Sequence, residues 1–265
     1  PYFLLEIFKL RTVIYGVLLF FFLMFLNSSA MFVNVFTNVG MKIDNWQSAV
    51  LGNWVLLGYF IGFLLIVILG GKGVHLKWLF SIGFVFIGLS ALYMYFEVQN
   101  DGMYERMKWP VIIRTIGMMI LYSLTAVHAN QRMPYRFMST WVCVMLAVRM
   151  VIGPGIGSAV YTNVMQYRQQ YYVTRYSHDY DRTNISIAND YDRTVNGMIY
   201  QGKSVTEANN MAAMSLKGKV QVQATISTIK EMSGLTFWGC MIVAVVVLLV
   251  PWRKRKMEEV NADIS

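Results

Sequence analysis

The stretches VIYGVLLFFFLMFL (residues 13–26) and MIVAVVVLLV (residues 241–250) decide the fold class, because each is apolar on every side of the helix it would form. A helix in a water-soluble domain keeps a polar face toward the solvent, and neither stretch provides one. A bilayer accepts such a helix, provided that roughly 20 predominantly apolar residues are available to cross it. The sequence therefore predicts membrane-spanning helices in both regions.

Four further stretches reach the required length with few charged residues. The six predicted spans cover residues 12–38, 46–69, 78–97, 110–128, 137–166 and 233–251. The composition agrees, because 56% of the 265 residues are hydrophobic and 14% are charged, whereas soluble domains average about 45–50% and about 25%. We therefore expect an all-α membrane protein. This composition excludes a disordered chain, a disulfide scaffold and a nucleic-acid-binding module, although the net charge is +9.

Tryptophans and basic residues predict the helix ends and the orientation. Indole rings favour the headgroup zone of a bilayer, and six of the seven tryptophans fall within about a turn of a predicted helix end: Trp46, Trp78, Trp109, Trp141, Trp238 and Trp252. If the C-terminus is cytoplasmic, the inner segments carry ten basic residues and the short outer loops carry three. This distribution follows the positive-inside rule. We therefore predict that residues 252–265 form a basic cytoplasmic tail.

The segment 167–232 interrupts the apolar pattern with a high density of charged side chains. We expect it to be a long extracytoplasmic loop. The sequence Ser204-Val-Thr-Glu207 matches a capping box, in which the two side chains satisfy free N–H groups at the start of a helix. The loop is therefore predicted to contain one short surface helix.

Neither a metal site nor a catalytic site is predicted. The pentapeptide Asp-Tyr-Asp-Arg-Thr occurs at 179–183 and again at 190–194, with oxygen ligands at the offsets of a calcium loop. However, Asn184 replaces the glycine that such a loop needs for its turn, and Asp190 replaces the bidentate glutamate. The sequence also lacks a Cys/His cluster, a glycine-rich phosphate loop and a nucleophile elbow. We predict that the protein is not an enzyme and needs no cofactor.

Polar residues within the predicted spans give the strongest indication of function, since polar groups in hydrocarbon are costly. They concentrate in the first, second, fourth and fifth spans, which we expect to line a polar cavity, while the third and sixth can face lipid. The candidate cavity-lining residues are Asn27, Asn34, Asn38, Asn53, Arg114, Met118, Tyr122, Met145 and Arg149. For the asparagines, hydrogen bonding between helices is the alternative interpretation.

Arg149 is the most informative of these residues, because it lies roughly 15–18 Å from the inner end of its helix and cannot lose its proton. It must meet water, a carboxylate or an anionic ligand. A purely structural ion pair, or capping of backbone carbonyls, is the alternative. Arg114 lies about a turn from the outer end of its span, where its side chain could instead extend to the interface.

Glycines follow Arg149 in the sequence Gly153-Pro-Gly-Ile-Gly157. Glycine allows helices to approach closely, and Pro154 frees a backbone carbonyl and can kink the helix. Gly153, Pro154, Gly155 and Gly157 are therefore candidates for a packing point or hinge. A rocking transporter needs such a point, and a static bundle could use one as well.

The chain resembles the C-terminal half of the fourteen-helix drug:proton antiporters of the major facilitator superfamily. The resemblance rests on the amphipathic lead-in Pro1–Arg11, on Arg149 with Gly153-Pro-Gly-Ile-Gly-Ser-Ala159, on the large outer loop, and on the stretch from Ser204 to Phe237 that leads into the last helix. The glycine spacing is one residue longer than in the family's form. The cytoplasmic loop Gly70–Lys77 lacks the acidic partner that a gating ion pair would need.

This resemblance implies a six-helix half of a transporter in the bacterial cytoplasmic (inner) membrane. It implies proton-coupled export of drugs or other amphipathic small molecules by alternating access, with the N-terminal half and a periplasmic adaptor protein as partners. Glu97 lies at the outer end of the third predicted span, and no carboxylate lies deeper in any of them, so we expect the proton-carrying acid in the N-terminal half. The alternatives are a non-transporting membrane scaffold or sensor, and an importer of organic anions, on the same fold.

Overall fold

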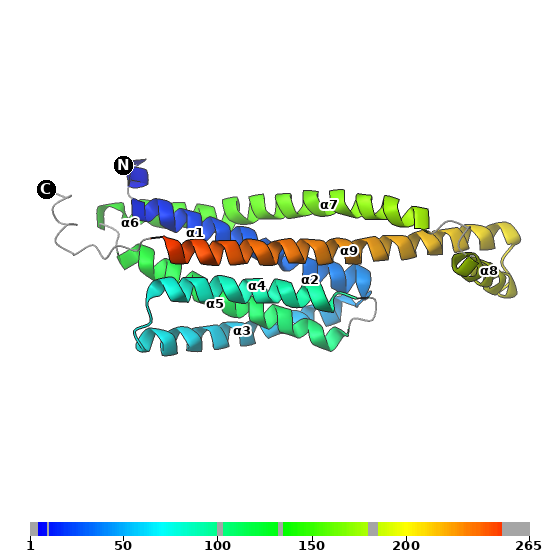
Figure 1. Cartoon of the computed structure of the whole chain (residues 1–265), viewed down its shortest axis with the longest axis horizontal. Helices are drawn as coiled ribbons and strands as arrows, with labels where there is room; N and C mark the ends of the chain where they lie inside the picture. Colours follow the sequence, from blue (N-terminus) through cyan, green and yellow to red (C-terminus); the bar gives the residue numbers. More distant parts are fainter. Residues whose placement is uncertain (1–4, 10, 100–102, 132–134, 180–184, 251–265) are drawn as a thin grey trace.

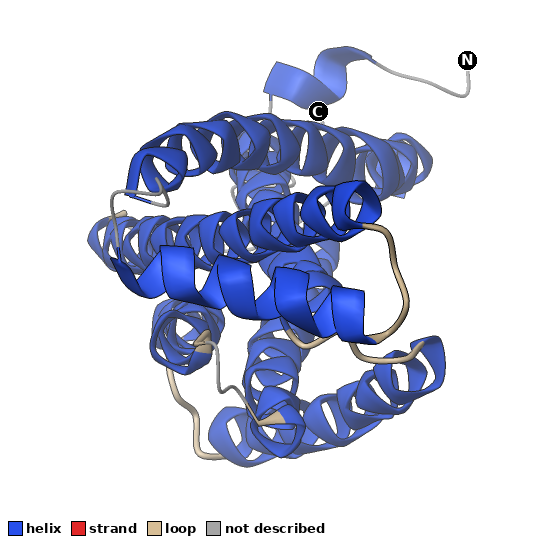
Figure 2. Ribbon diagram, turned by 90° about the vertical axis from the view of Figure 1, so that its right-hand side faces the viewer, coloured by secondary structure: helices blue, strands red, loops and turns tan. Residues whose placement is uncertain are grey.

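The computed structural model describes residues 5–9, 11–99, 103–131, 135–179 and 185–250, which form helices joined by short loops, with no strand among them (Figure 2). Six helical segments are long and apolar enough to cross a membrane. The predicted all-α class is therefore confirmed, and the number of helices able to span a membrane equals the number predicted. The basic tail and Trp252 lie outside the described residues.

The first span is built from α1 (Arg11–Asn27), the 3-10 turn η2 (Ser28–Ala30), α2 (Met31–Val35) and the π-helical turn η3 (Phe36–Gly40), preceded by the 3-10 turn η1 (Leu5–Lys9). The second, third and fourth spans are α3 (Asn45–Gly71), α4 (Leu76–Glu97) and α5 (Lys108–Gln131), with the 3-10 turn η4 (Tyr104–Met107) before α5. The fifth consists of α6 (Met138–Ala147), the π-helical turn η6 (Val148–Ile152) and α7 (Gly153–Asp179), preceded by the 3-10 turn η5 (Tyr135–Phe137). Helix α8 (Ile185–Tyr200) precedes α9 (Val205–Leu249), which contains the sixth span.

The helices form a long bundle from which α7 and α9 project together, with α8 beside α9 at the far end (Figure 1). Within the bundle, α4 packs against α5 and α9, α3 against α5, and α7 against α9 and α1. The start of α1 and the end of α9 lie at the same end of the molecule (Figure 1). This agrees with an even number of membrane crossings.

Helices α4 and α5 cross in close contact because a glycine lies at the crossing point on each. A Cβ atom on Gly117 would lie only 2.6 Å from the backbone oxygen of Gly83. Large apolar side chains, among them Phe80, Phe84 and Leu121, fill the space around this crossing. The third span is consequently more enclosed than expected for a lipid-facing helix, since over half of its most apolar stretch is buried.

The expectation of a loop with one short helix across 167–232 is wrong. Helix α7 continues to Asp179, α8 follows, and α9 runs without interruption from the capping box at Ser204 into the membrane span. The capping box itself is present, with the Ser204 hydroxyl accepting from the Glu207 N–H. Within this segment α9 buries one side of its helix, at intervals of four or eight residues: Ala208, Ala212, Val220 and Ala224.

One member of the predicted tryptophan belt is also placed differently. Trp46, Trp78, Trp109 and Trp238 are exposed, as a headgroup position requires. The side chain of Trp141 is completely buried. Its ring occupies the space beside Gly16 of α1, where a Cβ atom would lie 2.8 Å from the indole. Trp141 therefore helps to pack the first span against the fifth.

Candidate functional site

Arg149 lies on the π-helical turn η6, eleven residues after the start of α6. At 1.5 Å per residue this is roughly 16 Å, close to the middle of a hydrocarbon core about 30 Å thick. Pro154 explains the wider turn, because its ring would clash with the carbonyl four residues earlier in a regular α-helix. Single π turns inside α-helices are frequent at functional sites.

The guanidinium group of Arg149 lies over the ring of Tyr122 from α5. Its Cζ atom is 4.4 Å from the ring centroid, within the range of a cation–π interaction. The Tyr122 hydroxyl donates a hydrogen bond of 3.2 Å to the sulfur of Met24 on α1. The first, fourth and fifth spans therefore meet at one polar cluster, which we call the arginine cluster: Arg149, Tyr122 and Met24.

Apolar side chains surround this cluster. Phe20 of α1 lies 6.4 Å from Tyr122, measured between ring centroids. Met145 is half-buried and packs on the hydrophobic core one turn before Arg149. Met118, which we expected to line a cavity, is instead buried in that core. Of the predicted methionines, Met145 is thus the one that keeps part of its surface accessible near the arginine cluster.

Arg149 has no carboxylate partner within the described part of the chain. The ion pairs found there join Arg106 with Glu97, Lys108 with Glu105, Arg168 with Glu231 and Lys219 with Asp190. Tyr122 offers the guanidinium its ring face and a single hydroxyl oxygen, which cannot satisfy five N–H donors. The remaining donors of Arg149 are therefore available to a group from elsewhere.

Gly153 and Gly157 lie where the fifth span crosses the first. A Cβ atom on Gly153 would collide with the Cβ of Met24, and one on Gly157 would collide with the hydroxyl oxygen of Ser28. The two glycines therefore form a small-xxx-small contact directly beside the arginine cluster. Gly155, between them, faces outward, and a Cβ atom there would have no heavy atom within 4 Å. Pro154 is half-buried.

The other predicted polar residues do not join the arginine cluster. Arg114 is half-buried on α5, about two turns from Tyr122. Asn34, Asn38 and Asn53 are exposed on the surface of the chain, whereas Asn27 is half-buried.

Met24 and Phe20, which contact Tyr122, could not be predicted from the sequence. Both lie in the apolar stretch 13–26, and an apolar residue in an apolar run gives no signal by itself. The four-residue spacing of Phe20, Met24 and Ser28 matches the spacing of Met145, Arg149 and Gly153 on the fifth span. Equal spacing on two spans does not by itself predict a contact between them. It becomes informative only when the two helices are known to pack together.

Outside the bundle, α7 and α9 are joined by side chains that satisfy one another. Arg168 makes a bidentate ion pair with Glu231, which also accepts a 3.2 Å hydrogen bond from the hydroxyl of Tyr172. Further out, Asp190 of α8 lies 2.5 Å from the ammonium group of Lys219 on α9. This hydrogen bond and the positive charge lower the pKa of the Asp190 carboxyl below its usual value.

Comparisons with known proteins give no relative, since no family model, curated protein or solved structure matches this chain. The chemistry of the arginine cluster must therefore be judged from its geometry. A guanidinium fixed on an aromatic face near the membrane centre can bind an anionic group or form an ion pair with a carboxylate. Neither role requires a bond to be made or broken.

Proposed function

We propose that this chain is half of a secondary active transporter, similar to the fourteen-helix drug:proton antiporters of the major facilitator superfamily. In this proposal it exports amphipathic small molecules across the bacterial inner membrane by alternating access, with its C-terminal end in the cytoplasm. A second, N-terminal membrane half completes the cavity, and a periplasmic adaptor is a further partner. The observation that carries the proposal is Arg149, a permanent charge at mid-membrane depth without a carboxylate partner among the described residues.

Energetics favour a functional role for Arg149 over a structural one. An arginine at the centre of a membrane helix costs about 2.5–3.5 kcal/mol in insertion experiments. A desolvated cation–π contact, such as the one with Tyr122, returns about 2 kcal/mol or more, but it leaves most of the five N–H donors without an acceptor. The remaining donors need an acceptor, and a solute or a carboxylate from the other half would provide it. A residue needed only for packing would carry no such unbalanced charge.

The irregular turns of the first and fifth spans support alternating access. Both spans contain a π turn, and they touch at Gly153 and Gly157 beside the arginine cluster. Helices that approach this closely can slide or rock without moving large side chains. Rocking of two bundles around a midplane site is the general mechanism of such transporters. Export coupled to protons would further require a titrating carboxylate, which we assign to the N-terminal half.

The proposal is tested by dye efflux from cells that express the intact protein containing this chain, with and without an uncoupler. Arg149→Ala should uncouple export from the proton gradient, while Arg149→Lys, which keeps the charge but not the planar donors, should retain part of the coupling. Arg175→Ala is the matched control, since Arg175 is exposed on α7, in the outer part of the same span. Absence of efflux with the unaltered intact protein would favour the scaffold or sensor instead.

Transport of organic anions is the second candidate function, and the free donors of Arg149 favour it. A carboxylate or sulfonate on the solute would pair directly with the guanidinium. In that case Arg149→Ala should remove transport of anionic solutes and leave that of neutral and cationic ones intact. Unchanged transport of every solute class by Arg149→Ala would contradict both candidates.

A further inference from the structure

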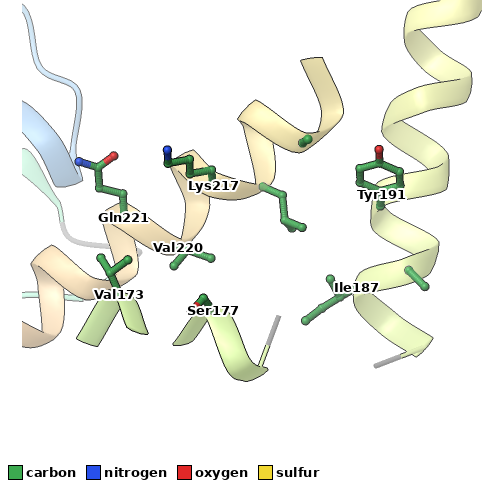
Figure 3. Close-up of a pocket in the computed structure, with 10 residues that line it drawn as sticks. Val173, Ser177, Ile187, Tyr191, Lys217, Val220 and Gln221 are labelled. Carbon is green, nitrogen blue, oxygen red and sulfur yellow. The ribbon is translucent and has the colours of Figure 1, made fainter. Parts of the chain in front are cut away.

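A cavity of about 570 Å³ lies outside the bundle, where α7, α8 and α9 meet. Val173 of α7, Ile187 of α8, and Leu216 and Val220 of α9 supply its apolar wall. Figure 3 shows Val173, Val220 and Ile187 around this common space, whereas the polar ends of Lys217 and Gln221 point away from it. Its volume falls within the range of about 300–1,000 Å³ that is typical of small-molecule sites.

The way α8 is attached explains why the space exists. Helix α8 is held to α9 by polar contacts, namely the ion pair between Asp190 and Lys219 and the hydrogen bond of 3.2 Å from the Tyr191 hydroxyl to the Asn209 carbonyl. No side chain described on α8 is fully buried, and Ile187 is only half-buried. The apolar face of this amphipathic helix therefore stays incompletely covered, which leaves favourable burial energy for a ligand to gain.

A second, polar hollow of about 460 Å³ adjoins the first on the side toward the membrane, since Val173 and Gln221 line both. Its wall is rich in carboxamides, which donate and accept hydrogen bonds alike: Gln166, Gln169, Gln170 and Gln221. Gln169 is already engaged, donating a 2.8 Å hydrogen bond to the hydroxyl of Thr225. Together the two hollows offer an apolar space with a neutral hydrogen-bonding end.

The charges around these hollows determine which ligand they suit. Lys219 is paired with Asp190, and Arg168 is paired with Glu231. The ammonium group of Lys217 points away from the apolar cavity (Figure 3). No unpaired charge of a lining residue is thus directed into the apolar space. An ionic ligand would lose hydration there without gaining a partner, whereas an uncharged one loses little.

From these observations we propose that the junction of α7, α8 and α9 is a binding site for an uncharged amphipathic small molecule. The apolar part of the ligand lies between Val173, Ile187, Leu216 and Val220, and its polar group lies among the glutamines. The site is separate from the arginine cluster, and its existence does not depend on transport.

The test is photolabelling of the purified intact protein in lipid nanodiscs with an uncharged octyl amide that carries a diazirine. Saturable labelling is expected in peptides from the outer part of α7, from α8 and from the first half of α9. An excess of the unlabelled octyl amide should remove this labelling. Octanoate, which has the same chain but a charged end, should compete at least about tenfold less well, because a desolvated carboxylate finds no partner.

Matched variants of neighbouring residues make the test specific. Ala213→Trp places a large ring in the cavity wall and should reduce labelling of these peptides about tenfold by removing apolar contact. Met214→Trp is the control, since Met214 is exposed and does not line the cavity. Where Ala213→Trp lowers the melting temperature, Ala188→Trp fills the cavity from the opposite wall. Labelling confined to the membrane spans, or unaffected by both filling variants, would overturn the proposal.

Discussion

Arg149 and Arg168 lie on the same continuous span and show how differently its two parts treat a positive charge. In the membrane part, Arg149 contacts the ring of Tyr122 and has no ion pair with a described carboxylate. In the projecting part, Arg168 is bonded twice to Glu231 and lies 5.1 Å from the ring centroid of Tyr171. The arginine is paired in the projecting part, where water could have solvated its charge. It has no ion pair with a described carboxylate in the membrane part, where hydrocarbon cannot solvate it. That inversion is the reason why we propose Arg149, and not Arg168, as the functional residue.

The helix contacts differ in the same way between the two regions. Within the membrane part, the first and fifth spans approach through Gly153 and Gly157, with no polar bridge at these points. In the projecting part, α7 and α9 are joined by hydrogen bonds such as the one of 2.7 Å between Tyr176 and Ser227. Close backbone contact depends on shape, whereas an ion pair such as that of Arg168 with Glu231 depends on charge and pH. Mutations should therefore affect the two regions through different mechanisms.

The largest effect is expected from Gly157→Leu, which attacks the shape-dependent contact. The new side chain would collide with the Ser28 hydroxyl and with the backbone of Phe25, where the Cβ alone would lie 3.1 Å from the Cα atom. We expect a loss of about 1–3 kcal/mol of stability from overpacking, seen as a lower melting temperature of the detergent-solubilised protein. Gly155→Leu, in open space two residues away, is the control. Equal melting temperatures for the two variants would contradict the crossing point.

Much of the membrane part could be predicted from sequence because hydrocarbon imposes a simple rule. Twenty apolar residues in a row have few alternatives to a span, so the number of spans was predictable. Arg149 could be singled out by the same rule, since a charge inside such a run is exceptional. The capping box at Ser204 was equally local, because its two side chains lie three residues apart.

Features that depend on contacts between distant segments could not be predicted in this way. The hydrogen bond from Tyr122 to Met24 joins residues 98 positions apart, and both lie in apolar runs. The density of charged residues in 167–232 predicts a loop, because polarity alone does not distinguish a loop from a helix that packs outside the membrane. Polar helices outside a membrane are stabilised by partners, and the partners of Arg168 and Tyr172 lie some 60 positions away.

A smaller effect is expected from separating Arg168 and Glu231 in the charge-dependent region. Nearly a third of each side chain is exposed, so solvent screening should keep the coupling between the two charges small. A double-mutant cycle of Arg168→Ala and Glu231→Ala, followed by thermal unfolding, measures it directly. Arg175→Ala on the same helix serves as the control and should change stability by about 0.5 kcal/mol or less. Additive single effects would show that the pair is not coupled, and the contrast with Arg149 would weaken.

The smallest effect is expected from Asp190, whose ion pair with Lys219 is about half exposed. Because Lys219 lowers the pKa of this carboxyl, the pair stabilises the packing of α8 on α9 fully above the usual carboxyl pKa. This stabilisation disappears as the pH falls through the lowered value.

The melting temperature of the unaltered protein should therefore exceed that of Asp190→Asn at pH 7, and the difference should vanish in strong acid or in about 1 M salt. Asp192→Asn, on the same helix but in no ion pair between described residues, should show no such pH-dependent difference. A melting-temperature difference that survived both acid and salt would mean that α8 is held by shape, as the membrane helices are. The charge-dependent region would then include only the contacts between α7 and α9.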